Sequence, residues 1–352
     1  MQQKTVLARG KMSIFLRIAG VAVVLCALMS AAGLLLIIKT NEFAFDSAIV
    51  ESTKVKDPAV KIPESFPVGV FPKKEKIVEN PIVDAYFDTY IASNAHPRTE
   101  TRLSWLQKNV LAQLSTFDWF QNLASPISRI LIINPGERKE EVAGSVGKIL
   151  HWDAVQKARF EEIVASSSPQ LQEGKFYPGH YVVDKDASPD DVAKIITEQF
   201  DANVALRYTP ETAAAVPFDE AMTVASLLER EAYDFTDMRY ISGIIWNRLF
   251  ADMNLQIDAS LQYAKGSNSA SAWWPVVRPA DKYINSPYNT YKNPGLPPTP
   301  IASPSPEAIL AALNPKQTNC MYYFHDKDGG FHCTATYEDH VALLKQYYGQ
   351  GK

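Results

Sequence analysis

Two glutamates, Glu229 and Glu231, have the type and spacing best suited to chemistry in this sequence. They lie in "DEAMTVASLLEREAYD", which predicts a helix because its apolar residues recur at helical spacing. At roughly 100° per residue, Glu231 falls inside the apolar arc and Glu229 on its border, whereas Arg230 points away. A carboxyl group in partly apolar surroundings has a raised pKa and holds a proton near neutral pH, as a general acid must. The alternative is that one glutamate pairs with Arg230 or Arg239 and has no chemical role.

The composition argues against several function classes. The formal net charge is -4, the sequence pI is about 5.9, and no basic and aromatic cluster is present, so we expect no nucleic acid partner. Three cysteines without a CxxC pair and six histidines without an HExxH pattern predict no metal site, and no cofactor is implied. The length of 352 residues suits one large domain or two to three smaller ones.

The N-terminal region predicts a membrane anchor. Residues 18–38, "IAGVAVVLCALMSAAGLLLII", form an uncharged run of 21 residues, long enough to cross a hydrocarbon core of roughly 30 Å as a helix. The run exceeds the apolar core of roughly 7–15 residues in a secretory signal peptide, which favours a retained transmembrane helix over a cleaved signal. Basic residues without acidic ones precede the run. We therefore expect a single span in the cytoplasmic membrane, with residues 1–17 as a cytoplasmic tail.

The remainder of the chain is then expected outside the cytoplasm, where thiols can oxidise. Cys320 and Cys333 flank a predicted hairpin, "CMYYFHDKDGGFHC". Two cysteines on paired strands meet only in a particular register, so the sequence leaves open whether they form a disulfide.

Between the anchor and the glutamates, the chain divides into two regions. Residues 39–123 predict a partly extended stalk with an accessory helical segment between residues 99 and 123. Residues 124–216 predict a small α/β unit, with a strand in "RILIINPGE", helices in "RKEEVAGSVGKIL" and "AVQKARFEEIVAS", and a further helix that Ser188 caps and Pro189 opens. Residues 217–352 hold the two glutamates.

Long motifs in this last region resemble one family. "VASLLEREA", "ISGIIWNRLFADMNLQIDASLQYAKG", "NSPYNTYKNPGLPPTPIASPSPEAILAALNP" and "YYFHDKDGGFHCTATYEDH" follow one another in the order and spacing of the endolytic murein transglycosylase family, also called the YceG-like family. The resemblance implies an α+β protein with one N-terminal transmembrane helix, a LysM-like α/β subdomain over residues 124–216, and a mixed α+β catalytic domain over residues 217–352.

The resemblance also implies an activity. Members of this family are lyases that cleave the β-1,4 bond between N-acetylmuramic acid and N-acetylglucosamine in nascent peptidoglycan, which leaves 1,6-anhydromuramyl ends and terminates strand elongation. Their catalytic acid is the first Glu of an Ala-Ser-x-x-Glu-x-Glu stretch, which is Glu229 here. Since the substrate supplies the nucleophile, no second carboxylate is needed. The implied partners are peptidoglycan glycan strands, the cytoplasmic membrane, and peptidoglycan synthases or divisome proteins.

Further positions match the family motifs and are predicted to bind substrate or to support Glu229. They are Glu231, Asn247, Gln256, Asp258, Ser286, Tyr288, Asn289, Thr290 and Tyr291. For some of them a structural role is an equal or stronger interpretation. Asn247 falls on what could be a solvated helix face, and Asp258 could cap a helix that starts at Ala259. Tyr288 and Tyr291 could stack on sugar rings or be ordinary packing residues.

The segment "SPYNTYKNPGLPPTPIASPSPE", residues 286–307, has the proline content of a linker but lies inside the catalytic region. Proline fixes φ and lowers the entropy lost on ordering, so we expect an ordered loop that forms a wall of the active-site cleft. Ser305 and Pro306 are expected to start the next helix.

Two other interpretations of the function remain. The chain could be a membrane-tethered protein of the same fold that binds or organises peptidoglycan with weak or no catalysis. It could also be a muramidase-type hydrolase, which adds water to the cleaved bond. The presence of Glu229 favours a lytic enzyme over the first alternative, and the reaction product distinguishes it from the second.

Overall fold

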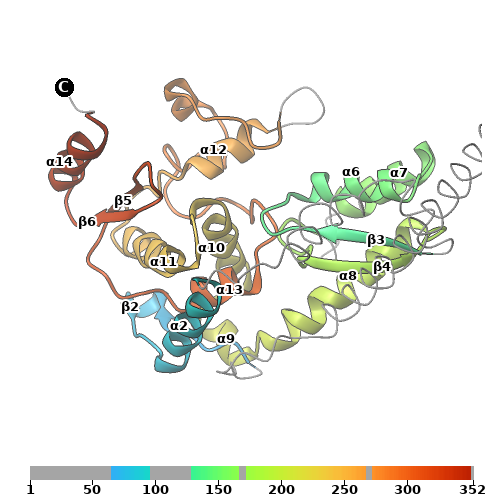
Figure 1. The fold of residues 1–352 in the computed structure, drawn as a ribbon, viewed down its shortest axis with the longest axis horizontal. Helices are drawn as coiled ribbons and strands as arrows, with labels where there is room; N and C mark the ends of the chain where they lie inside the picture. The colour runs from blue at the N-terminus through green and yellow to red at the C-terminus, as the bar shows by residue number, and fades with distance from the viewer. Residues whose placement is uncertain (1–64, 96–127, 166–171, 267–271, 350–352) are drawn as a thin grey trace, which may run out of the picture. The chain divides into compact units, whose positions relative to one another are not determined.

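The computed structural model describes residues 65–95, 128–165, 172–266 and 272–349, which form an α+β fold (Figure 1). Its strands are β1 (Val70–Phe71), β2 (Lys76–Ile77), β3 (Ser128–Ile133), β4 (Gly179–Asp184), β5 (Tyr322–His325) and β6 (Phe331–Thr334). Its α-helices are α2 (Pro81–Ala95), α6 (Lys139–Ile149), α7 (Ala154–Ala165), α8 (Pro189–Asn203), α9 (Pro210–Ala215), α10 (Phe218–Glu231), α11 (Phe235–Phe250), α12 (Asp258–Lys265), α13 (Pro306–Leu313) and α14 (Tyr337–Tyr348).

Two predicted segments lie outside the described residues: the transmembrane helix at residues 18–38 and the accessory helical segment at residues 99–123. Among the residues that the structure does describe, no helix combines the length and apolar character needed to cross a membrane.

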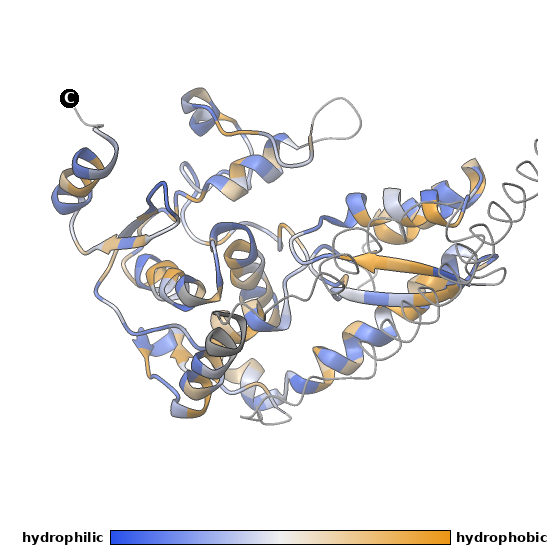
Figure 2. Ribbon diagram, viewed as in Figure 1, coloured by the Kyte–Doolittle hydropathy of each residue, from blue (hydrophilic) through white to orange (hydrophobic). Residues whose placement is uncertain are grey.

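A first hydrophobic core lies within residues 131–196. β3 and β4 pair in a two-stranded sheet, and α6, α7 and the first half of α8 pack with them. Alternate residues of β3 are buried, and Figure 2 shows this strand as hydrophobic along most of its length. The strand–helix–helix order was predicted for this unit. β4 was not, because its segment is rich in aromatic and turn residues rather than in the alternating pattern of a strand.

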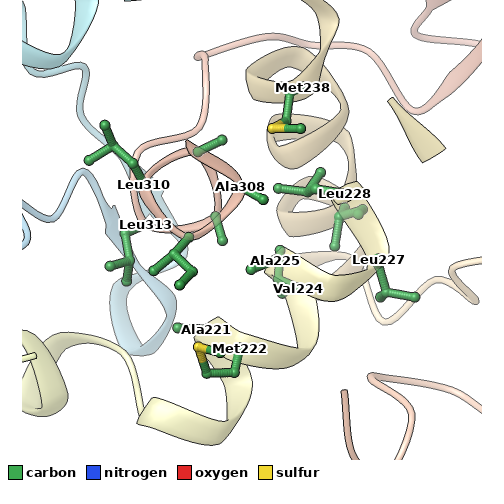
Figure 3. Close-up of a cluster of buried hydrophobic side chains, with 14 of the residues drawn as sticks. Ala221, Met222, Val224, Ala225, Leu227, Leu228, Met238, Ala308, Leu310 and Leu313 are labelled. Atoms are coloured by element: carbon green, nitrogen blue, oxygen red, sulfur yellow. The ribbon is translucent and has the colours of Figure 1, made fainter. Parts of the chain in front are cut away.

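A second core surrounds α10, in which all eight residues from Ala221 to Leu228 are buried. The helix packs against α11, α12 and α13. Small residues allow α10 and α13 to approach closely, since Ala225 on one helix and Ala308 on the other are fully buried. Figure 3 shows the labelled side chains of both helices converging, together with Met238 of α11.

Residues 65–95 differ from the predicted stalk. They form the antiparallel pair β1 and β2 and then α2, and several of their apolar side chains, among them Val70, Val83 and Phe87, belong to the second core. Asp84 of α2 accepts hydrogen bonds from Arg239 at 2.7 Å and from Lys316 at 2.9 Å, which tie the segment to residues of the C-terminal region. Strands of two residues are too short to produce a visible hydrophobic period, so the sequence pattern gave no sign of this packing.

α8 contributes to both cores. Val192 and Ile196 lie in the first core, whereas Phe200 and Val204, at the end of the helix, lie in the second. The predicted boundary at residues 216 and 217 coincides with the start of α10, but the packing changes within α8. The caps predicted from sequence are confirmed at this helix and at α13: the hydroxyl of Ser188 accepts a hydrogen bond from the Asp191 N–H, and that of Ser305 accepts one from the Ala308 N–H.

The C-terminal hairpin pairs β5 with β6 in an antiparallel register that places Tyr323 opposite Cys333. Cys320 and Cys333 form a disulfide, with their Cα atoms 5.7 Å apart. The structure therefore resolves the pairing that the sequence left open.

Candidate active site

The two glutamates occupy the last turn of α10, which ends at Glu231. Carbonyl groups at a helix C-terminus carry partial negative charge and disfavour a carboxylate. Each of these side chains, however, reaches the N-terminus of another helix, where free N–H groups favour an anion. Glu229 contacts the start of α13, and Glu231 contacts the start of α12.

Glu229 is held through one of its two carboxylate oxygens. Its Oε2 accepts hydrogen bonds from the backbone N–H of Ser305 at 2.8 Å and from the Ser305 hydroxyl at 2.6 Å. Among the described residues, its Oε1 accepts no hydrogen bond. The side chain is only partly buried, so one oxygen is anchored and the other remains available for a ligand.

Opposing influences act on the protonation of Glu229. Burial is the largest and raises the pKa, because a charged carboxylate loses hydration there. The hydrogen bonds from Ser305 lower the pKa, since they favour the charged form. Glu307 of α13 raises it by repulsion and Arg230 lowers it by attraction, and the net result is a pKa above the usual value.

Both carboxylate oxygens of Glu231 accept hydrogen bonds. Oε1 accepts a hydrogen bond from the Ala259 N–H at 3.0 Å, and Oε2 accepts one from the Tyr323 hydroxyl at 2.9 Å. Burial raises the pKa of Glu231, although these two hydrogen bonds oppose the shift. This carboxylate therefore joins α10, α12 and β5 and has a supporting position.

Neither glutamate pairs with the arginines that the sequence offered as partners. Arg239 forms a salt bridge with Asp84 at 2.7 Å. The guanidinium carbon of Arg230 lies 3.9 Å from the centre of the Trp274 ring, which is a cation–π contact. Arg230 therefore acts on Glu229 as a nearby charge within the same helix turn and not as a salt-bridge partner.

The turn at residues 134–137, which follows β3, lies beside Glu229. The backbone N–H of Gly136 donates to the Ser303 carbonyl, and the Ser303 N–H donates to the Glu137 carbonyl, both at 2.8 Å. A Cβ atom at Gly136 would lie 3.7 Å from Cγ of Glu229 and 3.1 Å from Nη1 of Arg230. Gly136 has φ of +80°, a conformation that glycine adopts without strain. The turn "NPGE" thus lies against the end of α10.

Four of the predicted site residues gather at the start of α12. The backbone N–H of Gln256 donates to the Thr290 carbonyl, and the Thr290 hydroxyl accepts from the Ile257 N–H at 2.9 Å. The Tyr291 hydroxyl donates to Asp258 at 2.6 Å. Asp258 does not cap this helix; it is the first helical residue, and Glu231 accepts the Ala259 N–H that a cap would have satisfied. The exposed side chains of Gln256 and Asp258 can reach a ligand.

Three further predicted residues shape the loop before Thr290. The buried Asn289 amide donates to the carbonyls of Lys282 and Ile284, so this side chain holds the loop and is not free for substrate. The Ser286 hydroxyl accepts a hydrogen bond from the Tyr288 N–H. The Tyr288 hydroxyl is 2.8 Å from that of Thr299 within the proline-rich segment, and its ring lies 4.8 Å from the Tyr263 ring, measured between centroids.

Asn247 lies apart from this group and makes structural contacts. Its side-chain amide donates to the carbonyl of Thr318 at 2.8 Å and to that of Cys320 at 3.2 Å. It therefore fastens the segment before β5 to α11. Its half-buried side chain does not lie on a solvated face, and a contact with substrate stays a prediction.

The proline-rich segment follows one irregular path between Tyr283 and α13. The Ile301 N–H donates to the buried Ser226 hydroxyl of α10 at 3.0 Å, and Ile301 itself is fully buried. A pocket that Leu296 of this segment helps to line lies near Glu220, at the opposite end of α10 from Glu229. The expectation that the segment forms a cleft wall beside Glu229 thus stays a prediction.

Within the described residues, no group of three or more His, Cys, Asp or Glu side chains is placed to hold a metal ion.

Sequence reasoning missed two contributors to the site. Ser305 was predicted only as a helix cap, and Tyr323 was not singled out. Ser305 nevertheless donates a hydrogen bond to Glu229, and Tyr323 donates one to Glu231. Ser305 lies 76 residues from Glu229, and Tyr323 lies 92 residues from Glu231. The only available signal was the cap motif at Ser305, which locates a helix N-terminus but not its neighbour.

Comparison of the sequence with curated proteins finds several relatives. Two Streptococcus pneumoniae proteins named endolytic murein transglycosylase are 26% identical to this chain over 355 residues, or 90% of this chain and 62% of theirs. A Bacillus subtilis protein of the same name is 33% identical over 176 residues, which is 50% of this chain and 48% of its own. The chain thus spans less than two thirds of the length of these relatives.

The fold and the family model agree with these likenesses. The crystal structure of a yceG-like protein from Listeria monocytogenes matches 79% of this chain and 97% of its own, with a TM-score of 0.55 and 21% sequence identity. The model of the YceG-like family matches residues 75–346, which include α10, α12, α13 and the C-terminal hairpin. With most of its length covered by that model, this chain belongs to the YceG-like family.

Proposed function

We propose that this protein is an endolytic lytic transglycosylase that cleaves the β-1,4 bond between N-acetylmuramic acid and N-acetylglucosamine in nascent peptidoglycan, with Glu229 as its single acid and base. The observation that carries the proposal is the contrast between the two glutamates of α10. One oxygen of Glu229 is free of hydrogen bonds from the described residues, whereas Glu231 uses both oxygens to join α12 and β5.

The proposed reaction needs only one carboxyl group. Protonated Glu229 gives its proton to the glycosidic oxygen as the bond from C1 of the muramyl sugar to that oxygen breaks. The resulting carboxylate then takes the proton of the C6 hydroxyl while that oxygen bonds to C1. Glu229 ends protonated again, no water is added, and the product carries a 1,6-anhydro ring.

The surroundings of Glu229 suit both halves of this cycle. Burial raises its pKa, which favours the protonated form that the first step requires. Ser305 and the N-terminus of α13 stabilise the carboxylate that the second step requires. The exposed side chains at the start of α12 and the loop at residues 286–291 would contact the glycan on either side of the cleaved bond.

The names of the curated relatives, endolytic murein transglycosylase, favour this activity over a binding or scaffolding role. Hydrolysis is the chemical competitor. An inverting or retaining hydrolase needs a second carboxylate to activate water or attack the sugar. Glu231, the nearest acid in sequence, has both oxygens engaged, which favours the lytic reaction.

We further propose that residues 18–38 anchor the protein in the cytoplasmic membrane, with residues 1–17 in the cytoplasm and the enzyme outside. The uncharged run and the basic residues before it support this topology. An anchored enzyme would meet glycan strands close to where they are made, alongside peptidoglycan synthases or divisome proteins, and its cuts would terminate strand elongation.

The test uses the full chain, purified peptidoglycan and mass spectrometry of the released fragments. We expect fragments lighter by one water than hydrolysis products, which is the signature of the anhydro end. Glu229→Gln should lower the rate roughly 10²–10⁴-fold, because the amide cannot deliver a proton.

Glu220→Gln is the matched control. It replaces another partly buried glutamate of α10, also with a pKa raised by burial, at the opposite end of the helix. The control should keep the wild-type rate. Release of hydrated ends alone would exclude the lytic reaction, full activity of Glu229→Gln would exclude Glu229 as the acid, and binding without any cleavage would leave the scaffold interpretation.

A further inference from the structure

Ser305 is the residue through which α13 contacts the carboxylate of Glu229. Its hydroxyl has two hydrogen-bond partners with fixed directions. The Ala308 N–H donates to this oxygen at 3.2 Å, which is the helix cap, and the hydroxyl lies 2.6 Å from Oε2 of Glu229. Since a backbone N–H can only donate, it occupies a lone pair of the hydroxyl and leaves the hydroxyl proton for Glu229.

The backbone N–H of Ser305 donates to the same Oε2 at 2.8 Å. Two donors therefore meet one carboxylate oxygen, which has two lone pairs in the carboxylate plane. A proton bound to Oε2 would compete with both of them. Oε1 has no such donor among the described residues, so it is the oxygen on which a proton can reside without breaking either bond.

We propose that Ser305 is a positioning residue for the proposed reaction: it reserves Oε2 of Glu229 as a hydrogen-bond acceptor and so presents the acidic proton on Oε1. This inference rests on the proposed function. It adds a division of labour within one carboxyl group, in which Oε2 is fixed to α13 and Oε1 exchanges the proton with the sugar.

The other charged groups that face Glu229 do not provide this anchoring. Arg230 of α10 attracts the carboxylate, and Glu307 of α13 repels it. Neither makes a hydrogen bond to Glu229, because the Glu307 carboxylate accepts from Tyr86 and Arg230 stacks on Trp274. Glu137, on the turn beside Ser303, directs its carboxylate to Asn134. Ser305 is thus the described side chain that fixes the orientation of the carboxyl group.

The test separates the two roles of Ser305 by substitution. Ser305→Ala removes both the cap and the hydroxyl donor. Ser305→Gly removes the donor but costs the helix little, since glycine is a good N-cap residue. Ser305→Thr keeps both functions. Ser188→Ala is the matched control, because Ser188 caps α8 in the same way, also followed by proline, and lies in the unit that contains the first core.

Two measurements are made on the full chain. The first is the pH dependence of kcat/KM for peptidoglycan cleavage, whose alkaline limb reports the loss of the acidic proton. The second is a carbon-13 NMR titration of glutamate carboxyl groups, in which the Glu229 signal is assigned by its absence in Glu229→Gln. The titration requires no turnover, so it tests the role of Ser305 even if the protein proves to have a different activity.

We expect Ser305→Ala and Ser305→Gly to move both the alkaline limb and the Glu229 titration to higher pH, since the carboxylate loses a donor. The value of kcat should fall on the order of tenfold, with KM changed by less than about twofold. Ser305→Thr should restore wild-type behaviour. Ser188→Ala should lower the stability of the protein about as much as Ser305→Ala does. It should shift neither the pH dependence of kcat/KM nor the Glu229 titration.

An unmoved Glu229 titration in both Ser305→Ala and Ser305→Gly would overturn the inference. So would an equal shift in Ser188→Ala, because the effect would then come from general loosening. Inactivity of the wild type, combined with the expected titration shifts, would reject the proposed function and leave the positioning role of Ser305 intact.

Discussion

The two glutamates of α10 show how one intervening residue separates two roles. Side chains two positions apart on a helix point about 200° apart around its axis, so they reach different neighbours. Glu229 meets the start of α13 through one oxygen, whereas Glu231 meets the start of α12 and β5 through both. The sequence placed both acids near the buried arc but could not distinguish them, because their partners lie far along the chain.

The two hydrogen bonds of Glu231 predict that its truncation costs more stability than its replacement by an amide. Glu231→Ala leaves the Ala259 N–H and the Tyr323 hydroxyl without their acceptor, so the free energy of unfolding should fall by about 1–3 kcal/mol. Glu231→Gln keeps an acceptor for Ala259 and should cost less. Urea unfolding of both variants at one pH checks the order, and an equal loss in the two would contradict a hydrogen-bonding role.

At the scale of elements, a glycine sets the approach of α11 to the segment before β5. A Cβ atom at Gly243 would lie 2.3 Å from the Lys316 carbonyl oxygen and 3.1 Å from Cγ2 of Thr318. The first distance is far below van der Waals contact with a backbone atom, so side chains cannot simply move aside. The same segment is held by the Asn247 amide one turn further along α11.

Gly243→Ala should therefore destabilise the protein by about 1–3 kcal/mol through overpacking. Gly144→Ala is the matched control, because this helical glycine of α6 is exposed and an added Cβ would meet nothing within 4 Å. There the better helix propensity of alanine should raise stability by about 0.5–1 kcal/mol. Thermal unfolding of the two variants gives shifts of opposite sign if the close approach is real; a stabilised Gly243→Ala variant would argue against it.

Local sequence signals were sufficient for some elements and insufficient for others. Ser188 and Ser305, each followed by proline, correctly marked the starts of α8 and α13, since a cap depends only on the next three residues. The Ala-Ser-x-x-Glu-x-Glu motif predicts Glu229 as the acid, and that role stays a prediction. The contacts of Asn247 and Tyr323 were not predictable, because each joins residues far apart in the chain whose approach depends on the tertiary fold. Those of Asn289 are local, but they depend on an irregular loop path that has no sequence period.

At the scale of the whole molecule, the main departure from expectation concerns residues 65–95, which were predicted as stalk and instead pack in the second core. The family model begins at residue 75, within this segment. Its elements are too short or too weakly patterned to be recognised individually, and their burial depends on α10 and α13. By contrast, the resemblance to the family implied the α+β class, and amphipathic periods and cap residues predicted helices around α10.

A buried acid between α6 and α12 links the two cores and makes stability depend on pH. Glu173 is 6% exposed; its carboxylate accepts from the Lys139 N–H and from the Tyr263 hydroxyl. Burial, assisted by repulsion from Glu140, raises the pKa of Glu173 from its usual 4.5 to about 8, against the weaker attraction of Arg138. The protonated form is therefore the one that the folded protein favours.

The sign of the effect follows from this raised pKa. Below about pH 4.5 the acid is protonated in both the folded and unfolded states; between 4.5 and about 8 only the unfolded state ionises, so stability falls as pH rises through this window. We expect Glu173→Gln to remove this pH-dependent loss of stability, which is on the order of a few kcal/mol in the free energy of unfolding. Urea unfolding at pH 5.5, 7 and 8.5 measures it, with the exposed Glu161→Gln as control. Parallel pH dependence in wild type and Glu173→Gln would refute the prediction.

The pairing of Gly136 and Glu137 with Ser303 has a consequence for how this protein can diverge. Both hydrogen bonds join backbone atoms, so they impose no complementary choice of side chains on the two segments. Only the glycine is constrained, by its positive φ and by the proximity of Arg230. Descendants of this sequence could therefore exchange residues on either side independently and keep the turn beside Glu229. Correlated substitution, the usual trace of contact in aligned sequences, would miss this contact beside Glu229.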